Sequence, residues 1–193
     1  MIVTIRRLFS LLLCIAPMLS TATPMNTDLV HQLLDEYSVW YASLVKNNGR
    51  LPRSISGVSD DGNQFILVVE GVNFNHVERH EFIKTILEIE KSRAFVYGSL
   101  SMTPTDEVLD IIAADSQRYI VGTWRVIRAS DGRALELQYL HTNEGSDPEK
   151  IPGAWFLTNA LSISNVDRLK YEDIWKHLRK DAHFRNRNVT RSK

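Results

Sequence analysis

The most constraining feature of this sequence is a long stretch, residues 93–141, in which a run of period two at 93–102 is followed by three β-rich runs separated by short turn clusters. A period of two is typical of half-buried β-strands, and short turn clusters join such strands as antiparallel neighbours. Ile111-Ile112 and a short link to the next run favour a strand over a helix at 105–114, the one alternative in this stretch. We therefore predict an antiparallel meander with strands at 93–102, 107–114, 119–128 and 134–141, a turn at residues 103–105 and a hairpin turn at Asp131-Gly132.

The remaining periodic segments predict three helices and two further strands. Apolar residues recur every three or four positions in residues 27–48, 76–91 and from Asn165 onward, as in amphipathic helices. Short apolar runs on either side of Asp61-Gly62 indicate a pair of strands. The chain is 193 residues long, which suits one domain, and we place it at residues 23–182. The predicted fold class is α+β: a single antiparallel sheet of about five to six strands packed by amphipathic helices.

The N-terminus has the three parts of a secretory signal peptide. Arg6 and Arg7 precede an apolar run from Leu8 to Leu19, and small residues follow up to Ala22. The run is too short to span a bilayer as a stable helix, so we expect cleavage after Ala22 and a periplasmic or secreted protein of bacterial origin. No stable membrane span then remains. The alternative is translation from Met25, which would leave the protein in the cytoplasm.

The charges are balanced over the whole chain but not along it. Lys and Arg total 23, as do Asp and Glu, yet the segment from Arg168 to Lys193 has a marked basic excess. We interpret residues 183–193 as a flexible basic tail in which Arg185, Arg187 and Arg191 are candidate partner-binding residues. A second candidate surface is Trp155-Phe156, after Pro152-Gly153, although a pair of large aromatics is more often buried in a core.

His76 and His80 are candidate metal ligands, because residues four apart lie on one face of a helix. Glu78 does not fit the zinc-helix motifs and is instead expected to form a capping box with Asn75 at the helix start. Both histidines are predicted at the margin of the buried face, whereas Glu81, Lys84, Thr85 and Glu88 are expected to face solvent. A third ligand would have to come from elsewhere, and His141 is the best available residue.

Several classes of site are not indicated. The order of the elements lacks the alternation of doubly wound nucleotide-binding folds, and there is no glycine-rich phosphate loop or G-x-S-x-G elbow. The only cysteine, Cys14, lies in the signal segment, so the mature chain has no thiol nucleophile. Asp106, Glu107 and Asp110 are close in sequence, and we interpret them as the polar face of an edge strand.

Two hypotheses follow. The first is a non-catalytic interaction or accessory protein of the bacterial envelope, which binds another envelope protein and no cofactor. Nucleic acid is not an expected partner of an exported chain. The second is a metal-assisted hydrolase that uses His76, His80 and His141.

Overall fold

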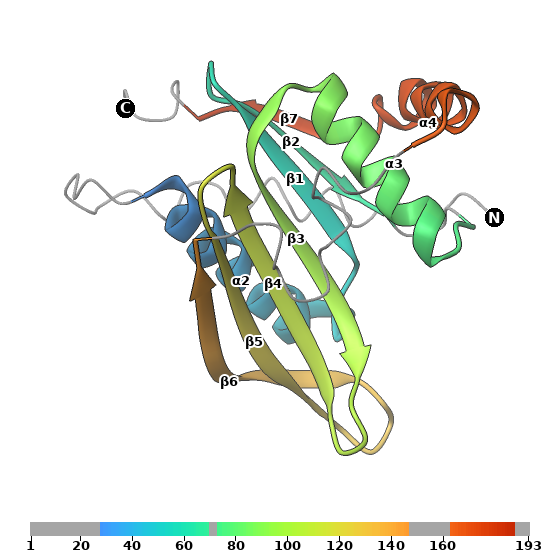
Figure 1. The fold of residues 1–193 in the computed structure, drawn as a ribbon. Helices are drawn as coiled ribbons and strands as arrows, with labels where there is room; N and C mark the ends of the chain where they lie inside the picture. Colours follow the sequence, from blue (N-terminus) through green and yellow to red (C-terminus); the bar gives the residue numbers. More distant parts are fainter. Residues whose placement is uncertain (1–27, 70–72, 147–162, 188–193) are drawn as a thin grey trace.

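A computed structural model describes residues 28–69, 73–146 and 163–187, which form three helices and seven strands (Figure 1). In chain order these elements are α2 (Leu29–Asn48), β1 (Ser54–Ser59), β2 (Asn63–Val68), α3 (His76–Ile89), β3 (Ser92–Met102), β4 (Glu107–Asp115), β5 (Tyr119–Arg128), β6 (Ala134–Gly145), α4 (Asn165–Leu178) and β7 (His183–Asn186).

The strands form one antiparallel sheet in the order β6-β5-β4-β3-β1-β2-β7, which confirms the predicted α+β class. The four-strand meander is also confirmed, and residues 107–115 are a strand rather than the alternative helix. Asp131-Gly132 makes the predicted hairpin turn, with Gly132 at a φ of 81°. The described sheet contains seven strands, more than the predicted five to six.

The additional strand lies in the segment predicted to be a flexible tail. Residues 183–186 pair with β2 over four positions and form one edge of the sheet. The prediction of a tail that begins at residue 183 is therefore wrong for these residues. Arg185 and Arg187 contact side chains of α2 and β2, which are remote in the sequence.

Helices cover both faces of the sheet, and a separate hydrophobic cluster fills each side (Figure 1). α2 contacts β3, β4, β5 and β6 on one face, while α3 contacts β3 and α4 on the other. Alternation along β4 places Leu109, Ile111 and Ala113 in the α2 cluster and Ile112 and Ala114 in the opposite cluster. No helix in the described part of the chain is long and apolar enough to cross a membrane.

α4 covers part of the α3 face that is expected from the sequence to be exposed. Thr85 is fully buried, and Glu81 accepts a hydrogen bond of 2.5 Å from the Tyr171 hydroxyl of α4. The prediction that these two residues face solvent is therefore wrong. Polar residues on one side of a helix indicate an exposed face only when no second helix supplies hydrogen-bond partners there.

Candidate functional site

His76 and His80 lie at the start of α3, where the predicted capping box is formed. The Asn75 side chain accepts from the Glu78 N–H at 2.9 Å, and the Glu78 carboxylate accepts from the Asn75 N–H at 3.0 Å. His80 is buried at 2% exposure, whereas His76 is exposed; their rings meet edge to face with centroids 4.1 Å apart. Burial, followed by the nearby charges of His76 and Arg79, lowers the pKa of His80 to about 4. His80 is thus a neutral imidazole at neutral pH.

His141 lies on β6, at the far edge of the sheet from β7, and it is exposed. Within the described residues, no group of three or more His, Cys, Asp or Glu side chains is placed to hold a metal ion. The structure therefore does not bring His141 together with His76 and His80. The two α3 histidines form an edge-to-face pair, and the described part of the chain brings no third protein ligand to them, as a catalytic zinc site would require.

The acidic residues at the start of β4 are bound to side chains of β5. Asp106 forms an ion pair with Arg125 at 2.9 Å, and Asp110 accepts from the Thr123 hydroxyl at 2.8 Å. Glu107 binds Arg128 through two hydrogen bonds, one of 2.7 Å. Our interpretation of an edge strand is wrong, because β4 lies between β3 and β5. Each carboxylate instead serves as a cross-strand partner.

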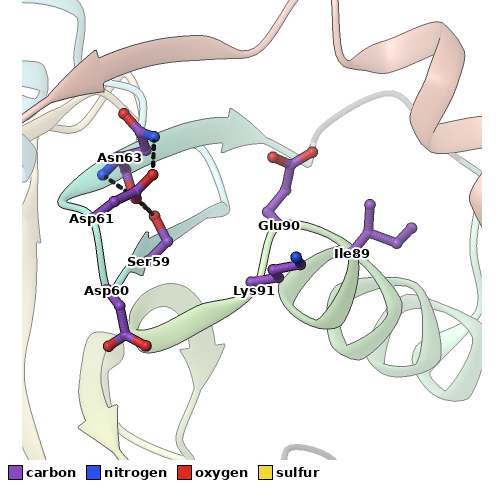
Figure 2. Close-up of a pocket in the computed structure, with 7 residues that line it drawn as sticks. All are labelled: Ser59, Asp60, Asp61, Asn63, Ile89, Glu90 and Lys91. Carbon is purple, nitrogen blue, oxygen red and sulfur yellow. Dashed lines mark hydrogen bonds between the residues drawn. The ribbon is translucent and has the colours of Figure 1, made fainter.

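An open hollow lies between the β1–β2 turn and the C-terminal end of α3, and it is lined by Ser59, Asp60, Asp61, Asn63, Ile89, Glu90 and Lys91 (Figure 2). Figure 2 shows the Asp61 carboxylate bonded to its neighbours within the turn. It accepts from the Ser59 hydroxyl at 2.5 Å and from the Asn63 amide group at 2.6 Å, and these bonds lower the pKa of Asp61.

The carboxylate on the opposite wall of this hollow is also bound. Glu90 accepts from the indole N–H of Trp175 at 2.8 Å and from the Arg179 guanidinium at 2.9 Å. Asp61 and Glu90 are therefore engaged in contacts that stabilise the turn and α4.

Of the five predicted partner-binding residues, the structure describes two. Arg185 and Arg187 lie on or next to β7 and bind Glu36 of α2 within the same chain. Trp155, Phe156 and Arg191 lie outside the described residues, as does the signal segment with Ala22. Arg185 and Arg187 are thus engaged in an internal contact rather than held out to solvent.

The surface that sequence reasoning did not single out is the outer edge of β6. This strand is the last of the meander and has twelve residues, of which nine are exposed. The sequence does contain a usable signal for it, since the final strand of a meander stays at the sheet edge unless a later segment pairs with it. In the described sheet no strand pairs with β6 on that side.

Comparison with known proteins adds no family to these observations: no family model, curated protein or solved structure matches the chain.

Proposed function

We propose that this chain is an exported envelope protein that binds another envelope protein, without catalysis, through the outer edge of β6. The observation that carries the proposal is a twelve-residue edge strand with which no strand pairs on one side among the described residues. Such an edge presents a row of backbone N–H and C=O groups, which is the surface that an extended segment of a partner uses when it adds a strand to a sheet.

Among the described residues, the end of α2 approaches the start of this edge, and most side chains farther along β6 are exposed. Ala134 donates its N–H to the carbonyl of Gly49 at 3.3 Å, so the end of α2 covers the first residue of the strand. Beyond it, large apolar side chains are exposed: Leu135 at 52%, Tyr139 at 56% and Leu140 at 38%. These residues offer a partner apolar contacts on both sides of an added strand.

β6 carries few of the devices that protect edge strands. It contains no proline and no lysine, and its only charged side chains are those of Glu136 and Glu144, apart from His141. Two register shifts in the pairing with β5 leave Leu135 and Leu140 as extra residues, so bulges are the protection that this strand does have. The residues between and beyond these bulges keep the extended conformation that an added strand needs.

The inner side of β6 is firmly paired. The strand pairs with residues 119–128 of β5, and Tyr139 packs edge to face on Trp124 with ring centroids 5.9 Å apart. A partner therefore meets an edge that is already formed, which lowers the entropic cost of binding because the backbone of β6 does not have to be ordered.

Binding rather than catalysis is supported by the hydrogen bonds and ion pairs that acidic side chains make at the other candidate sites. Asp106 and Glu107 at the start of β4 and Asp61 and Glu90 of the hollow are bound to structural partners. Export is supported by the N-terminal pattern of Arg6-Arg7, an apolar run and Ala22.

Site-specific photo-cross-linking tests the binding edge. A photoreactive residue at Gln138 or Asn143 on β6 is expected to give the same covalent adduct in the native host. The same residue at Val166, which is 78% exposed on α4, is the control and is expected to give none. Adducts of equal yield at Val166, or none at the two β6 positions, contradict the proposal.

Two lysine substitutions in β6 test whether the partner contacts the edge of this strand. Leu135→Lys with Leu140→Lys is expected to reduce the β6 adduct at least about tenfold, because lysine on an edge opposes strand addition. The matched control is Val166→Lys with Leu169→Lys, which changes two exposed apolar residues of α4 and is expected to leave the adduct unchanged. An equal loss in both variants argues against β6.

Export is tested separately by fractionation and intact mass after expression in a Gram-negative host. A periplasmic product that begins at Thr23 is the expected result. A cytosolic product that begins at Met25 contradicts export and leaves the β6 experiment to be judged in the cytoplasm.

A further inference from the structure

The opposite edge of the sheet is occupied by β7, and this strand is attached lightly. It has only four residues, and none of their side chains is buried. The β2–β7 pairing covers residues 63–66 and is extended by one bond from the Arg187 N–H to the carbonyl of Gly62 at 3.0 Å. A strand with so little buried apolar surface belongs to the parts of a protein that open locally at low free-energy cost.

On the α2 face, β7 is fastened by one carboxylate. Glu36 accepts from the guanidinium groups of Arg185 and Arg187, each with a shortest distance of 2.7 Å. Both arginines also donate to the Gln64 side-chain oxygen, at 2.7 Å and 3.1 Å, and Gln64 itself is fully buried and donates to Ser56. Arg187 directly follows the strand and its N–H continues the pairing with β2, so that the Arg185 and Arg187 side chains both reach the one carboxylate.

On the other face the contacts of β7 are looser. Phe184 lies under the Arg179 guanidinium at 4.6 Å from the ring centroid, yet it remains 40% exposed. α4, which precedes the strand, is anchored independently because Tyr171 and Trp175 are buried at 1% and 2% exposure. The turns at residues 179–182 separate the two elements, so β7 can leave the sheet while α4 stays in place.

We propose that β7 is a displaceable strand and that β2 beside it is a second strand-binding edge of this protein. The preferred occupant is an extended segment with an aromatic residue followed by basic residues at the next and third positions, the pattern that Phe184, Arg185 and Arg187 present. Its recognition rests on charge complementarity, since departure of β7 leaves the Glu36 carboxylate and the Gln64 amide without their two guanidinium partners. This edge and its test are independent of β6.

Hydrogen exchange of the full chain tests whether Glu36 holds the strand. In Glu36→Gln, amides of β7 and of residues 63–66 are expected to exchange at least about tenfold faster, because hydrogen bonds to a charged group are lost. Amides of β3, β4 and β5 are expected to exchange as before. The control is Glu107→Gln, which removes the carboxylate of another arginine pair, between β4 and β5. Unchanged β7 exchange in Glu36→Gln, or equal acceleration throughout the sheet, overturns the proposal.

Binding in trans tests whether β2 accepts another strand. A synthetic peptide of residues 182–187 is titrated into the Arg185→Ala/Arg187→Ala protein and followed by NMR at the β2 amides. It is expected to bind this variant at least about tenfold more tightly than the wild type, whose own β7 fills the edge. A peptide with alanine at both arginine positions is the matched control and is expected to bind neither protein. Equal affinity for variant and wild type, or no shift at the β2 amides, overturns the second edge.

Discussion

Gly98 on β3 lies directly beneath the ring of Tyr41, in a space smaller than a methyl group. A Cβ at this position would lie 2.0 Å from the Tyr41 hydroxyl oxygen. Tyr41 has no room to withdraw, because it is fully buried and its hydroxyl donates to the Pro52 carbonyl at 2.9 Å. We predict that Gly98→Ala lowers the free energy of unfolding by about 2 kcal/mol through overpacking.

Urea denaturation checks this prediction against Ser99→Ala, the neighbouring residue of the same strand. Ser99 is only partly buried, so its truncation is expected to change the free energy of unfolding by less than about 0.5 kcal/mol. Equal stability of the two variants would show that α2 moves away from the sheet without cost.

His80 makes stability depend on pH. Its pKa is 6.5 as an ordinary histidine and about 4 in the fold, where burial opposes the charged form. Between these values the unfolded chain holds more protons than the folded chain, so lowering the pH favours unfolding. Linkage predicts that this residue alone removes about 2 kcal/mol of stability between pH 7 and pH 5.

The measurement is the free energy of unfolding at pH 7 and pH 5 in the wild type, His80→Gln and His177→Gln. His80→Gln is expected to lose most of that pH dependence. His177, whose side chain is 73% exposed, serves as the control, and its variant is expected to retain the pH dependence. If His80→Gln keeps the pH dependence of the wild type, titratable groups other than His80 cause it.

At the scale of elements, the start of α3 depends on a local signal that the sequence displays. The Asn75 side chain accepts a hydrogen bond from the Glu78 N–H, and the Glu78 side chain accepts one from the Asn75 N–H. These two backbone N–H groups at the helix start therefore both have partners. Asn75→Ala is predicted to destabilise the protein by about 1 kcal/mol. Chemical denaturation measures it, with the exposed Asn73→Ala as control outside the helix. A loss in Asn73→Ala as large as that in Asn75→Ala would contradict the assignment of the cap.

Elements of this kind, defined by residues a few positions apart, can be predicted. The three helices, the meander and the strand at 107–115 all follow from local periodicity and turn residues. β7 cannot, because the sequence H-F-R-N has no period that distinguishes four strand residues from a polar tail. Its place is decided by Glu36 and by β2, more than a hundred positions away.

The same distance in sequence limits prediction of the candidate sites. Arg185 and Arg187 are visible in the sequence as a basic pair, but the carboxylate that binds them is in α2. His76 and His80 share a helix turn as their spacing indicates, whereas the position of His141 relative to them is set by the order of strands. Spacing predicts contacts within an element, and topology decides contacts between elements.

At the scale of the whole molecule, one sheet joins two hydrophobic clusters. β1 to β5 all place side chains in both clusters, since alternate residues point to opposite faces. α2 on one side and α3 with α4 on the other therefore rest on the same strands. We propose that these layers form a single cooperative domain, so that damage to one layer lowers the stability of both.

Leu33→Ala tests this coupling, because Leu33 is fully buried in the α2 layer. The cavity is predicted to cost about 3 kcal/mol, whereas Val39→Ala, at an exposed position of the same helix, is expected to cost less than about 1 kcal/mol. In Leu33→Ala, two losses of free energy are expected to be equal. One is the loss of global stability, measured by denaturation followed by far-UV circular dichroism, and the other is the loss calculated from hydrogen-exchange protection of the α4 amides. The reason is that the α4 anchors Tyr171 and Trp175 pack on strands that α2 also stabilises. If α4 kept its wild-type protection while α2 unfolded in Leu33→Ala, the two layers would be separate folding units.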